Sequence, residues 1–158
     1  MKKLIFSLLA AAALFVSFAF GKSAKNEEIE EPEKTSNLIK NGDFSKGKKF
    51  WDMFLSNGSA DQLVTENGEM EIRIKNPGPY EYAIQPYFDG FSLYKGGVYK
   101  YSFDVHSSIE RTFEWRLQVN GRDYHAYVGG WDSVGKETKH IETTFTMLEP
   151  THFSPRLV

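Results

Sequence analysis

Hydrophobic and polar residues alternate along most of the chain after Ser36, with the period of two that a half-buried β-strand shows. The alternation is clearest in the runs "EMEIRI", "VYKYSFDV", "TFEWRLQV" and "KHIETTFTM". The residues between the apolar ones point the opposite way, and those of the second run, such as Ser102, are predicted to be exposed or to face a cleft. The positions predicted to face the core are Met70, Ile72, Ile74, Tyr99, Tyr101, Phe103, Val105, Phe113, Trp115, Leu117, Val119, Ile141, Phe145 and Met147.

Short turn sequences separate these runs: "NGS" at Asn57, "NGE" at Asn67, "NPGP" at Asn76, "KGG" at Lys95 and "NGR" at Asn120. Asn-Gly supplies the left-handed residues that tight hairpins need, and no long window has the 3.6-residue period of a helix. We therefore predict one all-β domain, a sandwich of about nine short strands with no substantial helix.

The N-terminus has a different pattern. Lys2 and Lys3 precede an almost unbroken apolar run that ends in small residues, which predicts a signal peptide over residues 1–21, cleaved after Gly21 or alternatively after Ala24. The competing interpretation is a membrane anchor, for which the run is short. Residues 22–36 are rich in glutamate and predict an acidic disordered linker, which leaves 37–158 as the folded module.

Composition narrows the function. The chain has no cysteine, so neither disulfides nor a lipid-modified cysteine is expected. The predicted signal peptide implies that the protein is secreted, periplasmic or at the cell surface. The formal net charge of −2 leaves no basic field that would attract nucleic acid. No phosphate-binding loop or serine-nucleophile motif is present, and the histidines lie in separate segments without ligand-like spacing.

Four segments occur in the order and spacing of one module type: "NLIKNGDFSKGKKFW", "NGEMEIRIKNPGPYEYAIQPYF", "LYKGGVYKYSFDVHS" and "ETTFTM". On these segments the chain resembles carbohydrate-binding modules of families four, nine and twenty-two, over nearly all of residues 37–158. The resemblance implies a jelly-roll β-sandwich that binds a β-linked polysaccharide, β-glucan or xylan, in a cleft across one sheet. Such modules are non-catalytic and are often attached to secreted glycoside hydrolases. It also implies that the Asn-Gly-Asp-Phe turn opens the first strand, that Phe44 packs inward and that Trp51 is a core residue.

A sugar site needs aromatic rings against the C–H faces and planar polar groups for the hydroxyls. The outward faces of the runs "YAIQPYFD" and "TFEWRLQV" offer such groups. If the strands of these two runs are neighbours, the groups form one cleft floor. Phe54 and Tyr124 fall where the family stacks sugars, although Phe54 lacks a hydroxyl and Glu114 stands where some members carry arginine. Trp131 is assigned to a Gly-rich loop, as a third platform or as a cap on the sandwich. The predicted ligand-binding residues are Phe54, Gln85, Tyr87, Asp89, Glu114, Arg116, Tyr124 and Trp131.

The family often holds a structural Ca²⁺, and this chain matches two of its positions, Asp43 and Gly68. The sequence stops at "SPRLV", where relatives continue through the last strand and its aspartate, so the module is predicted to be C-terminally incomplete and its calcium site weak. No cofactor is required by the predicted binding function.

Two alternatives stay open at this point. The first is an extracellular adhesion or assembly domain that holds a protein partner, with Glu114 and Arg116 as an exposed cross-strand ion pair of little energetic value. The second is a small glycoside hydrolase that uses two of Glu114, Asp123 and Glu142 as its carboxylates.

Overall fold

The structure is a computed structural model that describes the backbone of residues 13–17 and all of residues 36–158. Within these ranges the backbone forms ten strands and no helix. The strands are β1 (Ala13–Ser17), β2 (Trp51–Leu55), β3 (Ser59–Val64), β4 (Met70–Asn76), β5 (Ile84–Phe88), β6 (Val98–Val105), β7 (Arg111–Gln118), β8 (Ala126–Val134), β9 (Lys139–Thr146) and β10 (Arg156–Leu157).

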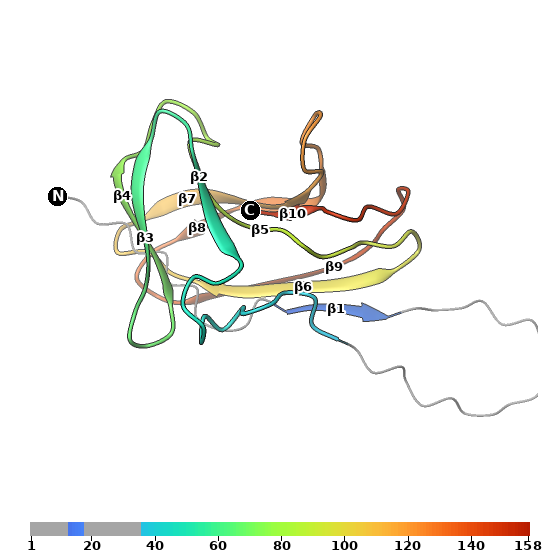
Figure 1. Cartoon of the computed structure of the whole chain (residues 1–158). Coiled ribbons are helices and arrows are strands. Elements are labelled where there is room, and N and C mark those ends of the chain that lie inside the picture. Colours follow the sequence, from blue (N-terminus) through green and yellow to red (C-terminus); the bar gives the residue numbers. More distant parts are fainter. Residues whose placement is uncertain (1–12, 18–35) are drawn as a thin grey trace, which may run out of the picture.

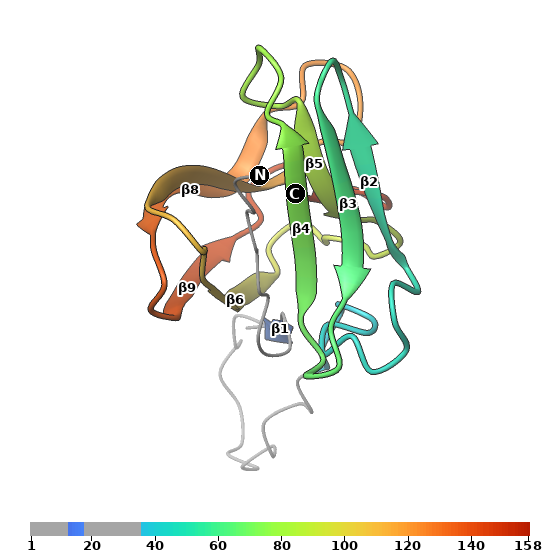
Figure 2. The ribbon, with the colours of Figure 1, turned by 90° about the vertical axis from the view of Figure 1, so that its left-hand side faces the viewer.

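The strands form a sandwich of antiparallel sheets. One sheet has the order β2-β5-β10-β7-β8, a second has the order β1-β6-β9, and β3 pairs with β4 as a separate hairpin. Figure 1 shows β6 and β9 in a layer below β5, β7, β8 and β10. From the side, the β3–β4 hairpin runs along β2 and β5 and closes one flank of the molecule (Figure 2).

Aromatic side chains fill the space between the layers. Trp51 packs against Phe44 and Phe88, with ring centroids 5.3 and 5.5 Å away, and its indole Nε1 donates a hydrogen bond to the carbonyl of Asn41. Trp51 is thus a core residue, as predicted, because a buried indole needs only one polar partner. On the other side of the core Trp115 packs between Tyr101 and Phe103.

The four alternating runs become β4, β6, β7 and β9, and the predicted inward residues lie in the core or against it. Val119 is the exception, since it follows the end of β7 and is only half-buried. Three outward residues are nevertheless buried: Glu71, Ser102 and Gln118. Glu71 tolerates burial because Arg73 donates two hydrogen bonds to its carboxylate, each 2.7 Å long.

The segment before β2 corrects one expectation. Residues 39–50 form successive turns instead of a first strand, and Phe44 is buried from a turn, with its backbone N–H bonded to the carbonyl of Asn41. Asn41 holds this segment together because its side chain donates to the carbonyls of Gly47 and Lys49.

The predicted signal peptide and linker lie outside the described residues except for Ala13–Ser17, which form β1 and pair antiparallel with β6 from Val98 to Ser102. The part of the chain that the structure describes contains no helix long and apolar enough to cross a membrane.

Candidate functional site

The outward side of the five-stranded sheet gathers the predicted ligand-binding residues of the strands. Trp51, Phe88, Trp115 and Leu157 face the core, so their neighbours along each strand face outward. The register sets Phe54 opposite Gln85 and Asp52 opposite Tyr87. We call this surface the cleft face; its residues are Asp52, Phe54, Gln85, Tyr87, Asp89, Glu114, Arg116, Trp131 and Arg156.

Arg156 occupies the centre of the cleft face. Its Nε and terminal nitrogen donate to the two carboxylate oxygens of Asp89, at 3.0 and 2.8 Å, and its guanidinium carbon lies 3.8 Å from the centroid of the Tyr87 ring. The Tyr87 hydroxyl in turn donates to Asp52, at 3.2 Å. A planar cation stacked on one face of an aromatic ring fixes the orientation of that ring.

The pKa values of this chain follow from its contacts. The pKa of Arg156 is raised, first by its hydrogen bonds to Asp89 and then by the negative charge of Asp89. Burial is the main cause that raises the pKa of Tyr87, followed by its hydrogen bond to Asp52. At neutral pH the site therefore presents a charged guanidinium and a neutral phenol.

A second group of polar side chains lies on β7 and β8. Arg116 Nε donates to Glu114 Oε1 at 2.6 Å, and Trp131 stands opposite Glu114 in the register. This ion pair joins residues two apart on one strand, so the expectation of a cross-strand pair is wrong. Trp131 lies in β8 instead of the expected loop, and 53% of its surface is exposed.

Tyr124 lies in the turn between β7 and β8, with half of its side chain exposed. Its backbone is left-handed, with a φ of 54°, and Arg122 in the same turn has a φ of 55°. Such angles cost a non-glycine residue energy, so contacts of the surrounding residues must hold this turn in place.

The cleft face is divided along its middle. The two strands that would form one cleft floor if they were neighbours, β5 and β7, are separated by β10, which pairs with both but covers only their ends. Beside the end of β10 lies a cavity of about 490 Å³ that reaches inward to core residues such as Ile72 and Phe103. Its wall also includes Gln85, Glu114, Arg116 and Trp131. The tyrosines of the loop before β5, Tyr80 and Tyr82, also line it.

Sequence reasoning missed four residues of this region. Asp52 could have been predicted from the alternation, because it lies two residues before Phe54 on the outward face of β2. Arg156 has a weak signal in its alternation with the buried Leu157. Tyr80 and Tyr82 follow the predicted "NPGP" turn, and their stacking, with ring centroids 5.1 Å apart and planes 4° apart, has no counterpart in the sequence pattern.

The predicted calcium positions lie next to each other, since a Cβ on Gly68 would come within 3.5 Å of the carbonyl oxygen of Asp43. The Asp43 carboxylate, however, accepts hydrogen bonds from the backbone and the hydroxyl of Ser45, which also lower its pKa. No three His, Cys, Asp or Glu side chains of the described residues lie close enough to hold a metal ion. This region supplies one carboxylate where Ca²⁺ prefers several oxygen ligands, so the residues fit the ion poorly.

The carboxylates proposed for catalysis do not form a set. Glu114 lies on the cleft face, whereas Glu142 lies on β9 of the opposite sheet, in an ion pair with Lys100. The Asp123 carboxylate contacts a third group, because its Oδ1 lies 2.9 Å from His125 Nδ1. A glycosidase needs two carboxyl groups on the two sides of one glycosidic bond, and residues on different sheets do not provide that arrangement.

Comparison with known proteins gives a consistent result. The family model described as "Carbohydrate binding domain" (CBM_4_9) matches residues 36–158. A solved structure described as "CBM4 structure and function" has a TM-score of 0.63 and 19% sequence identity, over 73% of this chain and 77% of that one. At this identity the likeness concerns the fold, a β-sandwich. Among proteins with curated descriptions, none matches the chain significantly.

Proposed function

The chain belongs to the carbohydrate-binding domain family, whose members are non-catalytic, and from this premise we propose that it binds a β-linked polysaccharide, β-glucan or xylan, across the cleft face. The observation that carries the proposal is that Phe54, Tyr87 and Trp131 share one sheet face with paired polar side chains. The half-exposed rings of Phe54 and Trp131 supply apolar platforms, and the polar groups between them match a rim of sugar hydroxyls.

The fixed geometry of the polar groups supports the same proposal. Arg156 and Arg116 are each held by a carboxylate of the face, so their remaining N–H groups are already oriented before a ligand arrives. Preorganised donors lose little conformational entropy on binding. An extended sugar chain could thus cover the face from Phe54 on β2 to Trp131 on β8.

Titration calorimetry with cellohexaose, laminarihexaose and xylohexaose tests this proposal. Tyr124→Ala should weaken binding by roughly 1 to 3 kcal/mol, which corresponds to about 5-fold to 150-fold. Arg116→Ala should cost a similar amount if its guanidinium contacts hydroxyls, and almost nothing if it serves only as the partner of Glu114. The proposal fails if the wild type binds none of the three sugars.

The cellular setting is part of the proposal. We infer an exported protein that acts beside a glycoside hydrolase, with no membrane attachment after cleavage. Cleavage after Gly21 would remove β1 and open the β6 edge from Val98 to Ser102. The intact mass of the protein recovered from the secreted or periplasmic fraction tests this: a mass that includes residues 1–21 would contradict it.

An adhesion or assembly domain remains the second candidate, and a different surface favours it. Leu148 and Phe153 are 79% and 70% exposed, and Phe153 packs edge-on against the exposed Tyr94. The contact of Tyr94 with Phe153 places two exposed aromatic rings together, which is typical of a protein contact surface. If the sugars fail to bind while substitution of Leu148 and Phe153 by serine abolishes attachment to the producing cells, this candidate replaces the first.

A further inference from the structure

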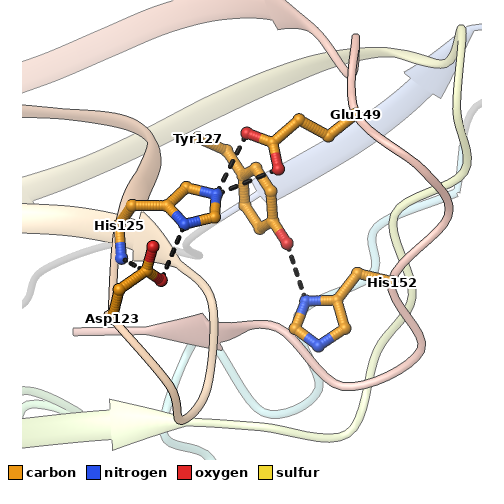
Figure 3. Close-up of polar contacts among 5 residues, drawn as sticks. All are labelled: Asp123, His125, Tyr127, Glu149 and His152. Carbon is orange, nitrogen blue, oxygen red and sulfur yellow. Dashed lines mark hydrogen bonds and ion pairs between the residues drawn. The ribbon is translucent and has the colours of Figure 1, made fainter.

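A histidine with two carboxylate partners adjoins the proposed Tyr124 platform. His125 lies between Tyr124 and the first residue of β8. Its Nδ1 is 2.9 Å from Asp123 Oδ1, and its Nε2 is 2.9 and 3.0 Å from the two oxygens of Glu149 (Figure 3). Asp123 belongs to the same turn, but Glu149 belongs to the connection from β9 to β10. The imidazole therefore ties two separate segments together.

Proton counting shows which form of His125 this geometry suits. A carboxylate only accepts hydrogen bonds, so each ring nitrogen must donate to keep both contacts. Only the doubly protonated imidazolium has two N–H groups. In the neutral ring one of the two nitrogens has a lone pair in place of its N–H group. That lone pair would face a carboxylate oxygen, either Asp123 Oδ1 at 2.9 Å from Nδ1 or Glu149 Oε1 at 3.0 Å from Nε2. Deprotonation thus replaces an attraction with a repulsion.

The other groups around His125 do not replace either contact. From β8, the Tyr127 ring meets the imidazole edge-on at 5.5 Å, and the Tyr127 hydroxyl bonds to His152 Nδ1 at 2.8 Å (Figure 3). His152 thus contacts the cluster through Tyr127. Asp123 and Glu149 are the charged groups that face the imidazole, one from its own turn and one from the β9–β10 connection.

The clamp ties the Tyr124 turn to another segment, whereas the other hydrogen bonds of the turn join residues 119–125 to one another, including the one from the His125 N–H to the Asp123 carboxylate. The Tyr124 N–H bonds to the carbonyl of Gly121, and the N–H of Val119 bonds to the carbonyl of His125. Between these bonds the left-handed Arg122 and Tyr124 strain the backbone. A contact to Glu149 anchors the turn to a segment outside itself, which restricts the positions open to the Tyr124 ring.

We propose that His125 is a positioning residue for Tyr124: as an imidazolium it clamps the turn to Glu149, so that saccharide binding is strongest in mildly acidic solution and weakens as the pH rises. This inference rests on the proposed sugar-binding function. It adds a pH dependence that the cleft face itself lacks, because the aromatic rings and the guanidinium groups of that face keep their charge state over the same range.

The direction of the pH effect follows from the contacts. Hydrogen bonds to Asp123 and then to Glu149 raise the pKa of His125. A raised folded-state pKa means that the clamp is complete below about pH 6.5, the ordinary histidine value, and is lost as the pH rises through the raised value. The pKa of Asp123 is lowered by the same pair, in agreement with this direction.

Calorimetry of the wild type and of Glu149→Gln, with cellohexaose, laminarihexaose and xylohexaose at pH 5.5 and 8.5, tests the proposal. The wild type should bind about 3- to 10-fold more weakly at the higher pH, a part of the loss expected from deleting an aromatic anchor. In Glu149→Gln the amide both donates and accepts, so it can pair with Nε2 in either protonation state. This variant should bind equally at both pH values, and more tightly than the wild type at pH 8.5.

Two control variants separate the clamp from general charge effects. Glu137→Gln makes the same chemical change in the exposed turn between β8 and β9 and should keep the pH dependence of the wild type. His140→Gln removes the histidine on β9 that also contacts carboxylates, and it should keep that dependence as well. Equal wild-type affinity at both pH values, or an unchanged pH dependence in Glu149→Gln, overturns the proposal.

A ligand-free measurement distinguishes failure of the clamp from failure of sugar binding. If the wild type binds none of the sugars at either pH, the proposed function fails, and NMR titration of the Tyr124 and His125 resonances decides on the clamp. Tyr124 signals that broaden as His125 loses its proton in the wild type, but not in Glu149→Gln, support the positioning role. Tyr124 signals that stay unchanged through the titration of His125 overturn it.

Discussion

The outward faces of the two main sheets obey the same alternation and carry different chemistry. On the cleft face, aromatic rings stand among paired charges. On the β6–β9 face the outward residues are short or charged, with Lys100 paired to Glu142 and His140 to Asp104, and none of the exposed aromatic side chains of the described residues lies on either strand. Alternation decides which residues reach solvent, whereas the rings decide which face suits a sugar.

The charge pairs of the two faces also differ in burial. The side chains of Arg156 and Asp89 are 18% and 28% exposed, whereas those of Lys100 and Glu142 are each 46% exposed. Removing one partner of a partly buried pair with two hydrogen bonds lowers the free energy of unfolding more than removing one partner of an exposed pair. The cleft face is therefore expected to be both the binding surface and the more rigid of the two.

The strongest test of the contrast is the loss of two platforms at once. Phe54→Ala combined with Trp131→Ala should weaken sugar binding by roughly 2 to 6 kcal/mol, about 30-fold or more, because two separated aromatic anchors contribute independently. Thr144→Ala with Thr146→Ala, on β9, should leave the calorimetric affinity unchanged. Equal losses in the two double variants would show that the faces do not differ in binding.

Arg156→Ala measures the difference in rigidity. It removes both hydrogen bonds to Asp89 and the stacking on Tyr87, so the free energy of unfolding should fall by about 1 to 3 kcal/mol. Lys100→Ala should cost about 0 to 1 kcal/mol. Urea denaturation followed by fluorescence compares them, and a larger loss for Lys100→Ala would reverse the assignment of the more rigid face.

Chelation tests a region that belongs to neither face, around Asp43 and Gly68. With one carboxylate at hand, Ca²⁺ should bind weakly and stabilise the fold little. Excess chelator should lower the melting temperature by about 1 to 2 °C or less. A larger drop in a thermal scan would mean that main-chain oxygens complete a tight site and that sugar binding must be measured with calcium present.

The smallest expected effect is the titration of His140 on the β6–β9 face. Hydrogen bonding to Asp104 is the main cause that raises its pKa. Its stabilising contribution is therefore present below about pH 6.5 and is lost as the pH rises through the raised value. The side chain is largely exposed, so this contribution is small. The melting temperatures of wild type and His140→Gln are compared at pH 5.5 and at pH 8.5, and the difference between the two proteins should be the same at both pH values to within about 1 °C. A change of several degrees would show that this face is held more tightly than its exposure implies.

Local pattern alone placed much of the candidate site. Because successive strand residues point to opposite faces, the outward position of Gln85 and Tyr87, and of Glu114 and Arg116, followed from the buried residues beside them. The same rule made Asp52 available once Phe54 was assigned. It could not show Trp131 to be a strand residue, since Gly129 and Gly130 beside it are typical of a loop.

The sequence by itself determined the all-β class, the inward and outward sets along each strand and the core position of Trp51, because these depend on a period of two and on apolar area. Only the tertiary structure decided which strands are neighbours. In the sandwich β10 lies between β5 and β7, so Arg156 contacts Asp89, which is 67 positions away in the sequence. Glu149 likewise contacts His125, which is 24 positions away. Backbone hydrogen bonds join any two strand edges alike, so the choice of neighbour depends on the packing of the whole sandwich and leaves little trace in the local pattern.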